Sequence, residues 1–363
     1  MYEKEILALQ KANRMRTREI FDDSLIDLAS NDYLGFAEDK SLFYDAVKYV
    51  EQYRFHAPKA SQLVNGYHPV HEMFENYLCE LNGFESGIVV GSGFLANLSL
   101  IEALPRKKDL LILDELYHAS GVLAAKLPDA EVCYFKHNNA QDLEKLLHEK
   151  SYKRAIVAVE GIYSMEGDLL NRDIFEVADR HEALLIVDEA HSSGVLGERL
   201  LGIFDHYGIM PKANHIKMGT LGKAMGSYGA YILASEEIIT FLQNRAKAII
   251  YATAPSVFDI ALAHKAVEKT QHEREELKTA LHERMNLAEE IFGISLESPI
   301  LKLPVNGASE ALAFKDYALK QGYLIGAIRP PTVSNSMLRI ILRSNVETAL
   351  IRKLLSALKE KGV

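Results

Sequence analysis

The chain has 363 residues, with 41 Lys and Arg against 50 Asp and Glu, so its formal net charge is −9. Hydrophobic residues make up 48% and charged residues 25% of the chain, a globular composition that excludes disordered and collagen-like proteins. The acidic balance argues against a nucleic-acid-binding protein, because such proteins neutralise phosphates with Lys and Arg.

The first forty residues are expected to form an N-terminal arm rather than a targeting segment. Glu3, Glu5 and Glu19 interrupt this stretch, and it has no apolar run of the kind found in secretory signals. No stretch of the chain approaches the roughly 18 apolar residues that cross a membrane. Two cysteines, Cys79 and Cys133, are too few for a disulfide framework. We therefore expect a cytoplasmic protein with no membrane segment.

Seven short apolar runs, mostly continuous, predict strands that are covered on both faces. They are Gly87–Val90, Leu110–Leu113, Val132–Phe135, Ala155–Val159, Ala183–Val187, Ile216–Met218 and Ala230–Leu233. Amphipathic helical patterns such as Val70–Leu81 and Ile174–His181 lie between them. This alternation predicts an α/β fold with a mostly parallel central sheet in a large domain over residues 41–255.

A smaller C-terminal α+β domain is expected over residues 256–363. Up to Phe292 the chain is crowded with charges, with apolar residues at helical spacing, which favours one solvated helix over a coiled coil. Beyond it, a strand-like LRIILR segment precedes a terminal amphipathic helix.

The residues that directly follow each predicted strand are the first candidates for a site, because ligands of parallel α/β sheets bind at the carboxyl ends of strands. Gly91–Asn97 is a glycine-rich turn that enters a helix, where backbone amides could meet an anion, although a plain tight turn explains it too. His118 follows the next strand. Asp188 ends another strand, where a buried acid needs a cationic partner, and His191 lies three residues on.

Lys223 follows the strand at Ile216–Met218 and is flanked by small residues. Partial burial would lower the pKa of its amine and free it for Schiff-base chemistry, whereas a surface lysine is the simpler alternative when the residue is taken alone.

Two other readings are excluded by spacing. Asp188–His191 resembles an ATPase acidic motif, but no complete phosphate loop is present, because Lys217 stands where its first glycine should be and Ala224 follows Lys223. Five His-Glu pairs begin at His71, His148, His181, His272 and His282, and none is completed as a zinc-hydrolase motif. We therefore expect no metal site.

The motifs taken in order resemble the α-oxoamine synthases, a family of fold-type I pyridoxal-phosphate enzymes. The resemblance runs from Ser30-Asn31-Asp32-Tyr33-Leu34-Gly35 through Gly-Ser-Gly-Phe, Asp-x-x-x-His-Ala-Ser, Glu-Gly-x-Tyr-Ser-Met-x-Gly-Asp, Val-Asp-Glu-Ala-His and Gly-Thr-Leu-Gly-Lys to the C-terminal domain. It implies a fold-type I transferase with pyridoxal 5'-phosphate as cofactor.

By resemblance, Lys223 would form the Schiff base with the cofactor aldehyde, and Asp188 would pair with the protonated pyridine nitrogen. His191 would bond the ring hydroxyl, and His118 would stack on the ring. These four residues are the expected catalytic set.

The remaining cofactor-binding residues implied by the resemblance are Gly93 and Phe94 at the phosphate through backbone amides, Thr220 through its hydroxyl, Ser164 near the ring oxygen and substrate carboxylate, and Thr253 in a stretch that crosses a dimer interface.

Arg329 in the segment Ala327–Val333 would clamp a substrate carboxylate, and Arg14 or Arg16 would meet the carboxylate of the acyl substrate. The chain departs from the family pattern at Ala60-Ser61-Gln62 and at Pro255-Ser256.

The segment Ala327–Val333 resembles the member of the family that condenses L-alanine with a pimeloyl thioester, on coenzyme A or on a carrier protein, in biotin synthesis. The resemblance implies a homodimer with its active site at the interface. Two alternatives remain open: a sister synthase that uses glycine or serine with another acyl thioester, and a non-catalytic pyridoxal-phosphate protein.

Overall fold

The computed structural model describes residues 1–12 and 14–363, which form two compact units. The sheet unit comprises Asp32–Ser164 and Asp168–Ala280, and the terminal unit comprises Met1–Asn31, Met165–Gly167 and Leu281–Val363. Among the described residues, no helix combines the length and apolar character needed to span a bilayer.

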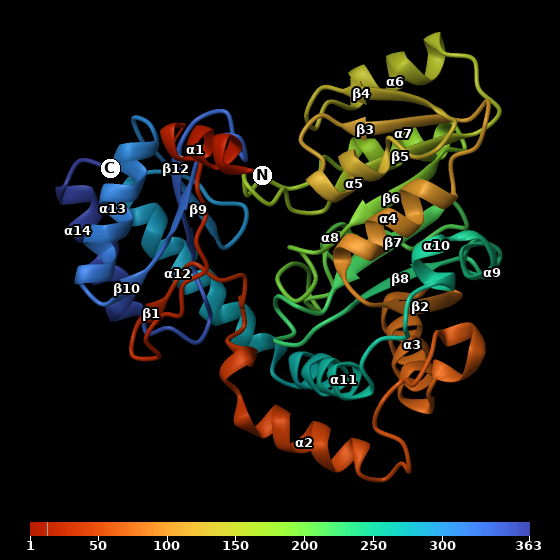
Figure 1. Ribbon diagram of the computed structural model, residues 1–363, viewed down its shortest axis with the longest axis horizontal. Helices are drawn as coiled ribbons and strands as arrows, with labels where there is room; N and C mark the ends of the chain where they lie inside the picture. Colours follow the sequence, from red (N-terminus) through yellow and green to blue (C-terminus); the bar gives the residue numbers. More distant parts are fainter. Residues whose placement is uncertain (13) are drawn as a thin grey trace. The chain divides into compact units, whose positions relative to one another are not determined.

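The sheet unit is built on a seven-stranded sheet in the order β2-β8-β7-β6-β5-β3-β4 (Figure 1). Its strands are β2 (Ser86–Val90), β3 (Leu110–Asp114), β4 (Glu131–Phe135), β5 (Ala155–Glu160), β6 (Leu184–Asp188), β7 (His215–Thr220) and β8 (Ala230–Ala234). The five strands from β7 to β4 are parallel, and β8 runs antiparallel to both β7 and β2. Each predicted strand is present within two residues of its expected ends, and the fold class is confirmed.

Helices cover the sheet and bury its apolar side chains. The helical segments of the unit are η1 (Phe36–Glu38), α2 (Lys40–Val50), η2 (Gln62–Gly66), α3 (Pro69–Asn82), α4 (Gly93–Ala103), α5 (Ala119–Ala124), α6 (Ala140–Glu149), α7 (Asp173–Arg180), α8 (Ile203–Tyr207), α9 (Glu236–Arg245), α10 (Lys247–Ile250) and α11 (Val257–His272). Alternate strand positions pack with α4, α5, α9 and α10 in one core, which includes Leu100, Leu113, Ile186 and Ile232. The central strands are buried at every position, as in β3 and β5, and burial on both faces of the sheet explains the continuous apolar runs.

The terminal unit is α+β. It contains α1 (Glu3–Lys11), a two-stranded pair of β1 (Ile26–Asp27) and β10 (Tyr323–Leu324), an antiparallel sheet of β9 (Ile300–Pro304), β11 (Gly326–Ile328) and β12 (Met337–Ile341), α13 (Ala308–Lys320) and α14 (Thr348–Glu360). The amphipathic C-terminal helix buries Ile351, Leu354, Leu355 and Leu358 against this small core.

The unit boundary differs from the expected one at residue 256. The segment from Val257 onward is two helices, α11 and α12 (Arg274–Phe292), and not one. Helix α11 buries eight side chains and packs against α2 and α3 within the sheet unit (Figure 1). Only α12 has the mostly solvated surface that the charge pattern predicted. The C-terminal part of the terminal unit begins within this helix, at Leu281.

Candidate functional site

Four polar residues end the central parallel strands of the sheet unit. Asp114, Glu160, Asp188 and Thr220 are the last residues of β3, β5, β6 and β7. Glu160 and Asp188 are direct partners across the β5–β6 ladder, and Asp188 lies opposite Met218 of β7. Because these strands are parallel, the four side chains lie along one edge of the sheet, where parallel α/β folds bind ligands.

Asp188 is a buried carboxylate held by uncharged donors. Only 4% of the residue is exposed. Its Oδ2 accepts from Asn97 Nδ2 at 2.8 Å, and its Oδ1 accepts from the Ala190 backbone N–H at 2.9 Å. Among the described residues, no Lys, Arg or His forms an ion pair with it. A buried charge without a cation is costly, so this carboxylate is suited to a cationic group that the protein does not supply.

Lys223 lies on the loop after β7 and belongs to a short chain of polar contacts. Its Nζ is 2.7 Å from Nε2 of His191, and the other ring nitrogen, Nδ1, is 2.7 Å from the hydroxyl of Tyr33. His191 and Tyr33 are both buried, and Lys223 is partly buried. The contacts bring together a primary amine and an imidazole, which can exchange a proton directly.

His118 caps the N-terminus of α5 and is linked to Asp188 through two side chains. Its Nδ1 is 2.6 Å from Ser120 Oγ, which in turn accepts from Asn97 Nδ2 at 3.0 Å. Burial lowers the pKa of His118, nearby Asp188 raises it, and the charge of Lys223 lowers it, with a net lowering. An exposed imidazole ring beside Asp188 and Lys223 can stack on a flat ligand.

The glycine-rich turn and the end of β7 meet at the start of α4. A Cβ at Gly93 would lie 3.6 Å from both Cβ and Oγ1 of Thr220. Ser92 caps the helix by accepting from the Leu95 N–H, and Phe94 is exposed. The N-terminus of an eleven-residue helix and a neighbouring hydroxyl form a place where an anion can accept several hydrogen bonds.

Ser164 lies beyond β5 and is tied to Glu160. The Ser164 N–H donates to Glu160 Oε2 at 3.2 Å, while Glu160 Oε1 is buried and has no hydrogen-bond partner among the described residues. Burial and the charge of Asp188 raise the pKa of Glu160 well above its usual range. A polar atom of a buried carboxyl group is therefore left for a ligand at this edge.

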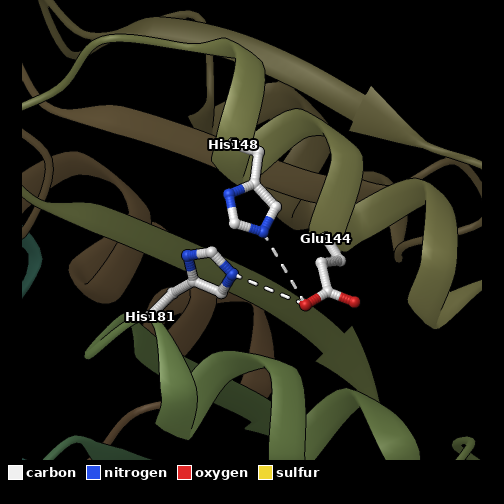
Figure 2. Close-up of side chains that lie close together, drawn as sticks. All are labelled: Glu144, His148 and His181. Atoms are coloured by element: carbon white, nitrogen blue, oxygen red, sulfur yellow. Dashed lines mark ion pairs between the residues drawn. The ribbon is translucent and has the colours of Figure 1, made fainter.

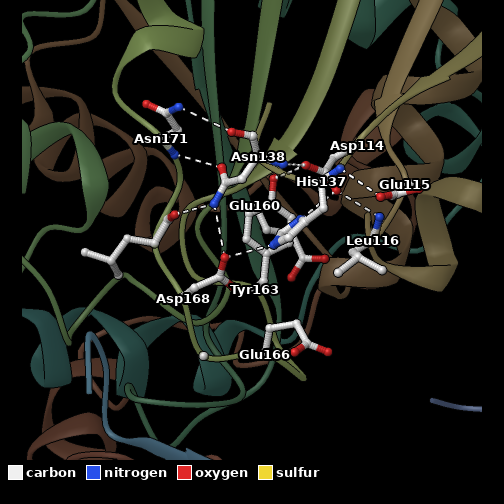
Figure 3. A network of polar contacts seen from close by, with 12 residues as sticks. Asp114, Glu115, Leu116, His137, Asn138, Glu160, Tyr163, Glu166, Asp168 and Asn171 are labelled. Carbon is white, nitrogen blue, oxygen red and sulfur yellow. Dashed lines mark hydrogen bonds and ion pairs between the residues drawn. The ribbon is translucent and has the colours of Figure 1, made fainter. Parts of the chain in front are cut away.

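A polar network holds the segment that carries Ser164 (Figure 3). His137 bridges two carboxylates, with Nδ1 3.0 Å from Asp114 Oδ1 and Nε2 2.8 Å from Asp168 Oδ2. Asn138 donates through its side-chain Nδ2 to Asp168 and to the Leu169 carbonyl. The Tyr163 hydroxyl donates to Asp114 Oδ2 at 2.8 Å. The network joins the ends of β3 and β4 to the loop between β5 and α7.

A second lysine, Lys217, lies within β7 and is fully enclosed. Lys217 Nζ donates to Asn82 Oδ1 at 2.8 Å and to the Leu201 carbonyl, and it lies 3.6 Å from the buried Glu189. Burial lowers its pKa, although Glu189 opposes that effect. Only 1% of Lys217 is exposed.

In the terminal unit, the predicted carboxylate-binding arginines share one pocket of about 500 Å³. Arg14, Arg16 and Arg329 line it with Leu9 and the segment Ala327–Thr332. Arg16 Nη2 donates to Thr332 Oγ1 at 3.0 Å. The structure thus places both N-terminal candidates beside Arg329.

The comparisons with known proteins agree on one family. The aminotransferase class I and II model matches residues 23–358. Two 8-amino-7-oxononanoate synthases of Helicobacter pylori, from strains 26695 and J99, are each 43% identical to this chain, over 94% of it and 92% of their own length. The chain belongs to the aminotransferase class I and II family.

Solved structures of this family agree with the fold. The 8-amino-7-oxononanoate synthase of Francisella tularensis is 27% identical, with a TM-score of 0.78 over 94% of this chain and all of that one. Serine palmitoyltransferase of Sphingomonas wittichii is 23% identical, with a TM-score of 0.89 over 99% of this chain and 97% of that one, a likeness of fold alone.

Members of the aminotransferase class I and II family use pyridoxal 5'-phosphate, and the residues at the strand edge fit that group. A cationic pyridinium nitrogen suits the buried Asp188, which forms no ion pair within the described part of the chain. An aldehyde suits the amine of Lys223, and a phosphate suits the start of α4 beside Thr220.

Among the predicted cofactor-binding residues of the sheet unit, Thr253 is not joined to the others by any contact within the described residues. It lies exposed on the segment between α10 and α11. The neighbouring departure from the family pattern has a local explanation, because Ser256 Oγ accepts from the Asp259 N–H and so caps α11. At the other departure, Gln62 Nε2 donates to the Val89 carbonyl and ties η2 to β2.

Three residues at the strand edge of the sheet unit were missed from the sequence, namely Tyr33, Asn97 and Glu160, and in the terminal unit Arg339 was missed as well. Asn97 stood out as a polar residue inside the apolar helix Gly93–Ala103, and Tyr33 lies in a motif that carried the resemblance. Arg339 is buried in β12 and donates from Nη1 to Asn31 Oδ1 at 2.8 Å, while its Nη2 has no hydrogen-bond partner among the described residues. Arg339 lies within the strand-like segment LRIILR, where the apolar residues around it indicated only a strand.

Proposed function

We propose that this chain catalyses the decarboxylative condensation of L-alanine with a pimeloyl thioester to give 8-amino-7-oxononanoate, CO2 and free coenzyme A or carrier protein, a step of biotin synthesis. The observation that carries the proposal is the contact of the Lys223 amine with His191 on the loops that follow β7 and β6, together with the buried carboxylate of Asp188 at the end of β6, in a chain 43% identical to curated 8-amino-7-oxononanoate synthases. The roles below rest on that family membership and on the geometry of the site.

Bound at this edge, pyridoxal phosphate supplies an electron sink for the bonds that break at the substrate's Cα. Asp188 Oδ2 and Oδ1, fixed by Asn97 and the Ala190 N–H, hold the proton on the pyridine nitrogen. Lys223 Nζ is the group that would hold the aldehyde of the cofactor, and its amine would serve as the base for the Cα proton of the substrate.

His191 and Tyr33 form a chain of polar contacts that ends at the amine of Lys223. Nε2 of His191, at 2.7 Å from Nζ, can take up or return a proton, and the Tyr33 hydroxyl fixes the ring through Nδ1. His191 would also bond the ring hydroxyl of the cofactor, and His118 would stack on the ring. Gly93, Phe94 and Thr220 would hold the phosphate, and Ser164 would lie near the ring oxygen.

Carboxylates of the substrates are bound by arginines of the terminal unit. Arg329 and Arg339 are the candidates for the alanine carboxylate, since each offers a planar guanidinium that pairs with a carboxylate through two hydrogen bonds. Arg14 is our candidate for the far carboxylate of the pimeloyl chain, and Arg16 shares its pocket. The carboxylate of alanine and the one free carboxylate of the pimeloyl thioester would together account for a pocket that gathers three arginines.

The active form is a homodimer in this proposal, with Thr253 contributed to the partner's cofactor site. Large apolar side chains are exposed on the segments near the strand edge, including Leu63, Val64, Phe94 and Tyr251, the last at 81%. A second copy of the chain would cover them, as exposed apolar patches of this kind mark interfaces.

The proposal is tested by the visible spectrum of the purified protein with pyridoxal phosphate, recorded before and after L-alanine and pimeloyl-CoA are added. We expect a visible band that changes with alanine, and release of coenzyme A that needs both substrates. Lys223→Ala should lose the band and the turnover together. A coloured, fully active Lys223→Ala variant would refute the proposal, and turnover with glycine or serine in place of alanine would assign the chain to a sister synthase.

A further inference from the structure

A cluster of three metal-binding side chains lies on the sheet unit away from the strand edge. Glu144 and His148 stand one turn apart on α6, and His181 directly follows α7. One ligand atom from each of the three lies within 4.8 Å of the others. Figure 2 shows both imidazole rings directed at the same carboxylate oxygen of Glu144. His148 and His181 are two of the His-Glu pairs that formed no recognised motif in the sequence.

The distances are close to those of a bound transition metal. Nε2 of His148 and Nε2 of His181 each lie 3.9 Å from Glu144 Oε1. Ligand atoms around a tetrahedral zinc ion, with bonds of about 2.0–2.1 Å, stand about 3.4 Å apart. Each nitrogen must therefore approach the carboxylate oxygen by about half an ångström, and the two nitrogens, which lie within 4.8 Å of each other, must approach by at most about 1.4 Å, movements that side-chain torsions can supply.

Nε2 of His181 is left unpaired by the described residues. Its Nε2 is buried and has no hydrogen-bond partner among the described residues, and 3.9 Å to Glu144 is too long for a hydrogen bond. A buried polar atom left unpaired is destabilising, so it favours a ligand that can pair with it.

The backbone around His181 is held in place before any ion binds. Asp179, two residues earlier, accepts from Lys212 Nζ at 2.5 Å, from Asn214 Nδ2 at 3.1 Å and from His215 at 2.9 Å. His181 N–H donates to the Val177 carbonyl and so closes the last turn of α7. On α6, the four-residue spacing of Glu144 and His148 puts both on one face.

We propose that Glu144, His148 and His181 form a site for a divalent transition metal of the zinc class. Two imidazole nitrogens and one carboxylate are the ligands of zinc, nickel and copper, whereas calcium and magnesium prefer oxygen alone. Three protein ligands leave positions for water, since His148 is mostly exposed. The ion links α6 to the end of α7.

Arg180 competes with the ion for the carboxylate of Glu144. Its Nη1 donates to Glu144 Oε1, the same oxygen toward which both histidines point. The arginine side chain is 57% exposed and can swing into solvent when the ion binds. Removing this cation should therefore tighten metal binding, a direction opposite to that expected from removing a ligand.

The test is calorimetric titration of the cofactor-loaded, full-length protein with zinc chloride after treatment with a chelator. The unaltered protein should bind one more equivalent than His148→Ala or His181→Ala, each of which should weaken this site more than about tenfold. Arg180→Gln should tighten it about two- to fivefold, the worth of an exposed ion pair. His282→Ala, which removes an exposed histidine on α12, is the matched control and should bind as the unaltered protein does.

Equal zinc binding by the unaltered protein and by both histidine variants would overturn the site. So would an Arg180→Gln variant that binds no more tightly, because Glu144 would then not be a ligand. Thermal unfolding with and without zinc checks the same point independently. The melting temperature should rise with zinc in the unaltered protein and stay constant in His181→Ala.

Discussion

Replacing His137 by glutamine tests the network that holds the Ser164 segment. Glutamine keeps a donor near the position of Nε2 but carries no charge, so Asp114 and Asp168 lose their shared cation. Removing one partner of a buried ion pair costs about 3–5 kcal/mol. Because the His137 side chain is 22% exposed and Asp114 keeps three other donors, we expect a smaller loss of about 2–3 kcal/mol.

This loss depends on pH in a direction that the structure fixes. Burial lowers the pKa of His137, but hydrogen bonds to Asp114 and Asp168 and their charges raise it to about 10. An unfolded histidine titrates near 6.5. The contribution of His137 is therefore complete below about pH 6.5 and is lost as the pH rises toward 10.

Thermal unfolding of His137→Gln and the unaltered protein at pH 6 and pH 9.5 measures the effect. We expect the variant to melt about 3–4 °C lower at pH 6, with the gap reduced by at least half at pH 9.5. His282→Gln, an exposed histidine, is the control and should change neither value. A gap of the same size at both pH values would show that the charge of His137 does not stabilise the network.

Three further changes probe the site and the core. Asn97→Leu removes the donor to Asp188 and should weaken cofactor binding at least tenfold by fluorescence titration, with the fold intact by circular dichroism, because a hydrogen bond to a charged group contributes about 1.5–3 kcal/mol. Arg329→Ala should raise KM for a carboxylate substrate at least tenfold while leaving the visible spectrum unchanged, and parental kinetics would count against its role. Burial raises the pKa of Glu75 to about 7, so the native state holds its proton and stability falls as pH rises from about 4.5 to 7. Glu75→Gln should therefore stabilise the protein at pH 8 but not at pH 5, and equal melting shifts at both pH values would contradict this.

The strands and their polar ends could be predicted because burial on both faces leaves an unbroken apolar run. Asp188 and Lys223 follow such runs, and the parallel order of β6 and β7 brings their loops to one edge. The same logic failed beyond Val257, since charged residues on the solvent side of α11 obscured its eight buried positions. The break between α11 and α12 at Glu273 has no glycine or proline to mark it.

Partners from distant segments could not be predicted in this way. Tyr33 contacts His191 across 158 positions of sequence, and Asn97 reaches Asp188 across 91. The sequence around Tyr33 and around Asn97 is equally typical of residues that only pack in the core. Their polar partners are therefore visible only in the folded chain. The choice between Arg14 and Arg16 stayed open for the same reason, and the pocket that holds both arginines does not separate them.

The enclosure of Lys217 has a chemical consequence for the neighbouring amine. Two lysines stand six positions apart along β7 and its loop, and a lowered pKa alone would make the buried one an effective nucleophile toward aldehydes. Asn82, the Leu201 carbonyl and Glu189 leave it no path to a reagent. An aldehyde can therefore react with Lys223 but cannot reach Lys217. A change that opened the enclosure around Lys217 would give the protein a second lysine that could form an unproductive Schiff base.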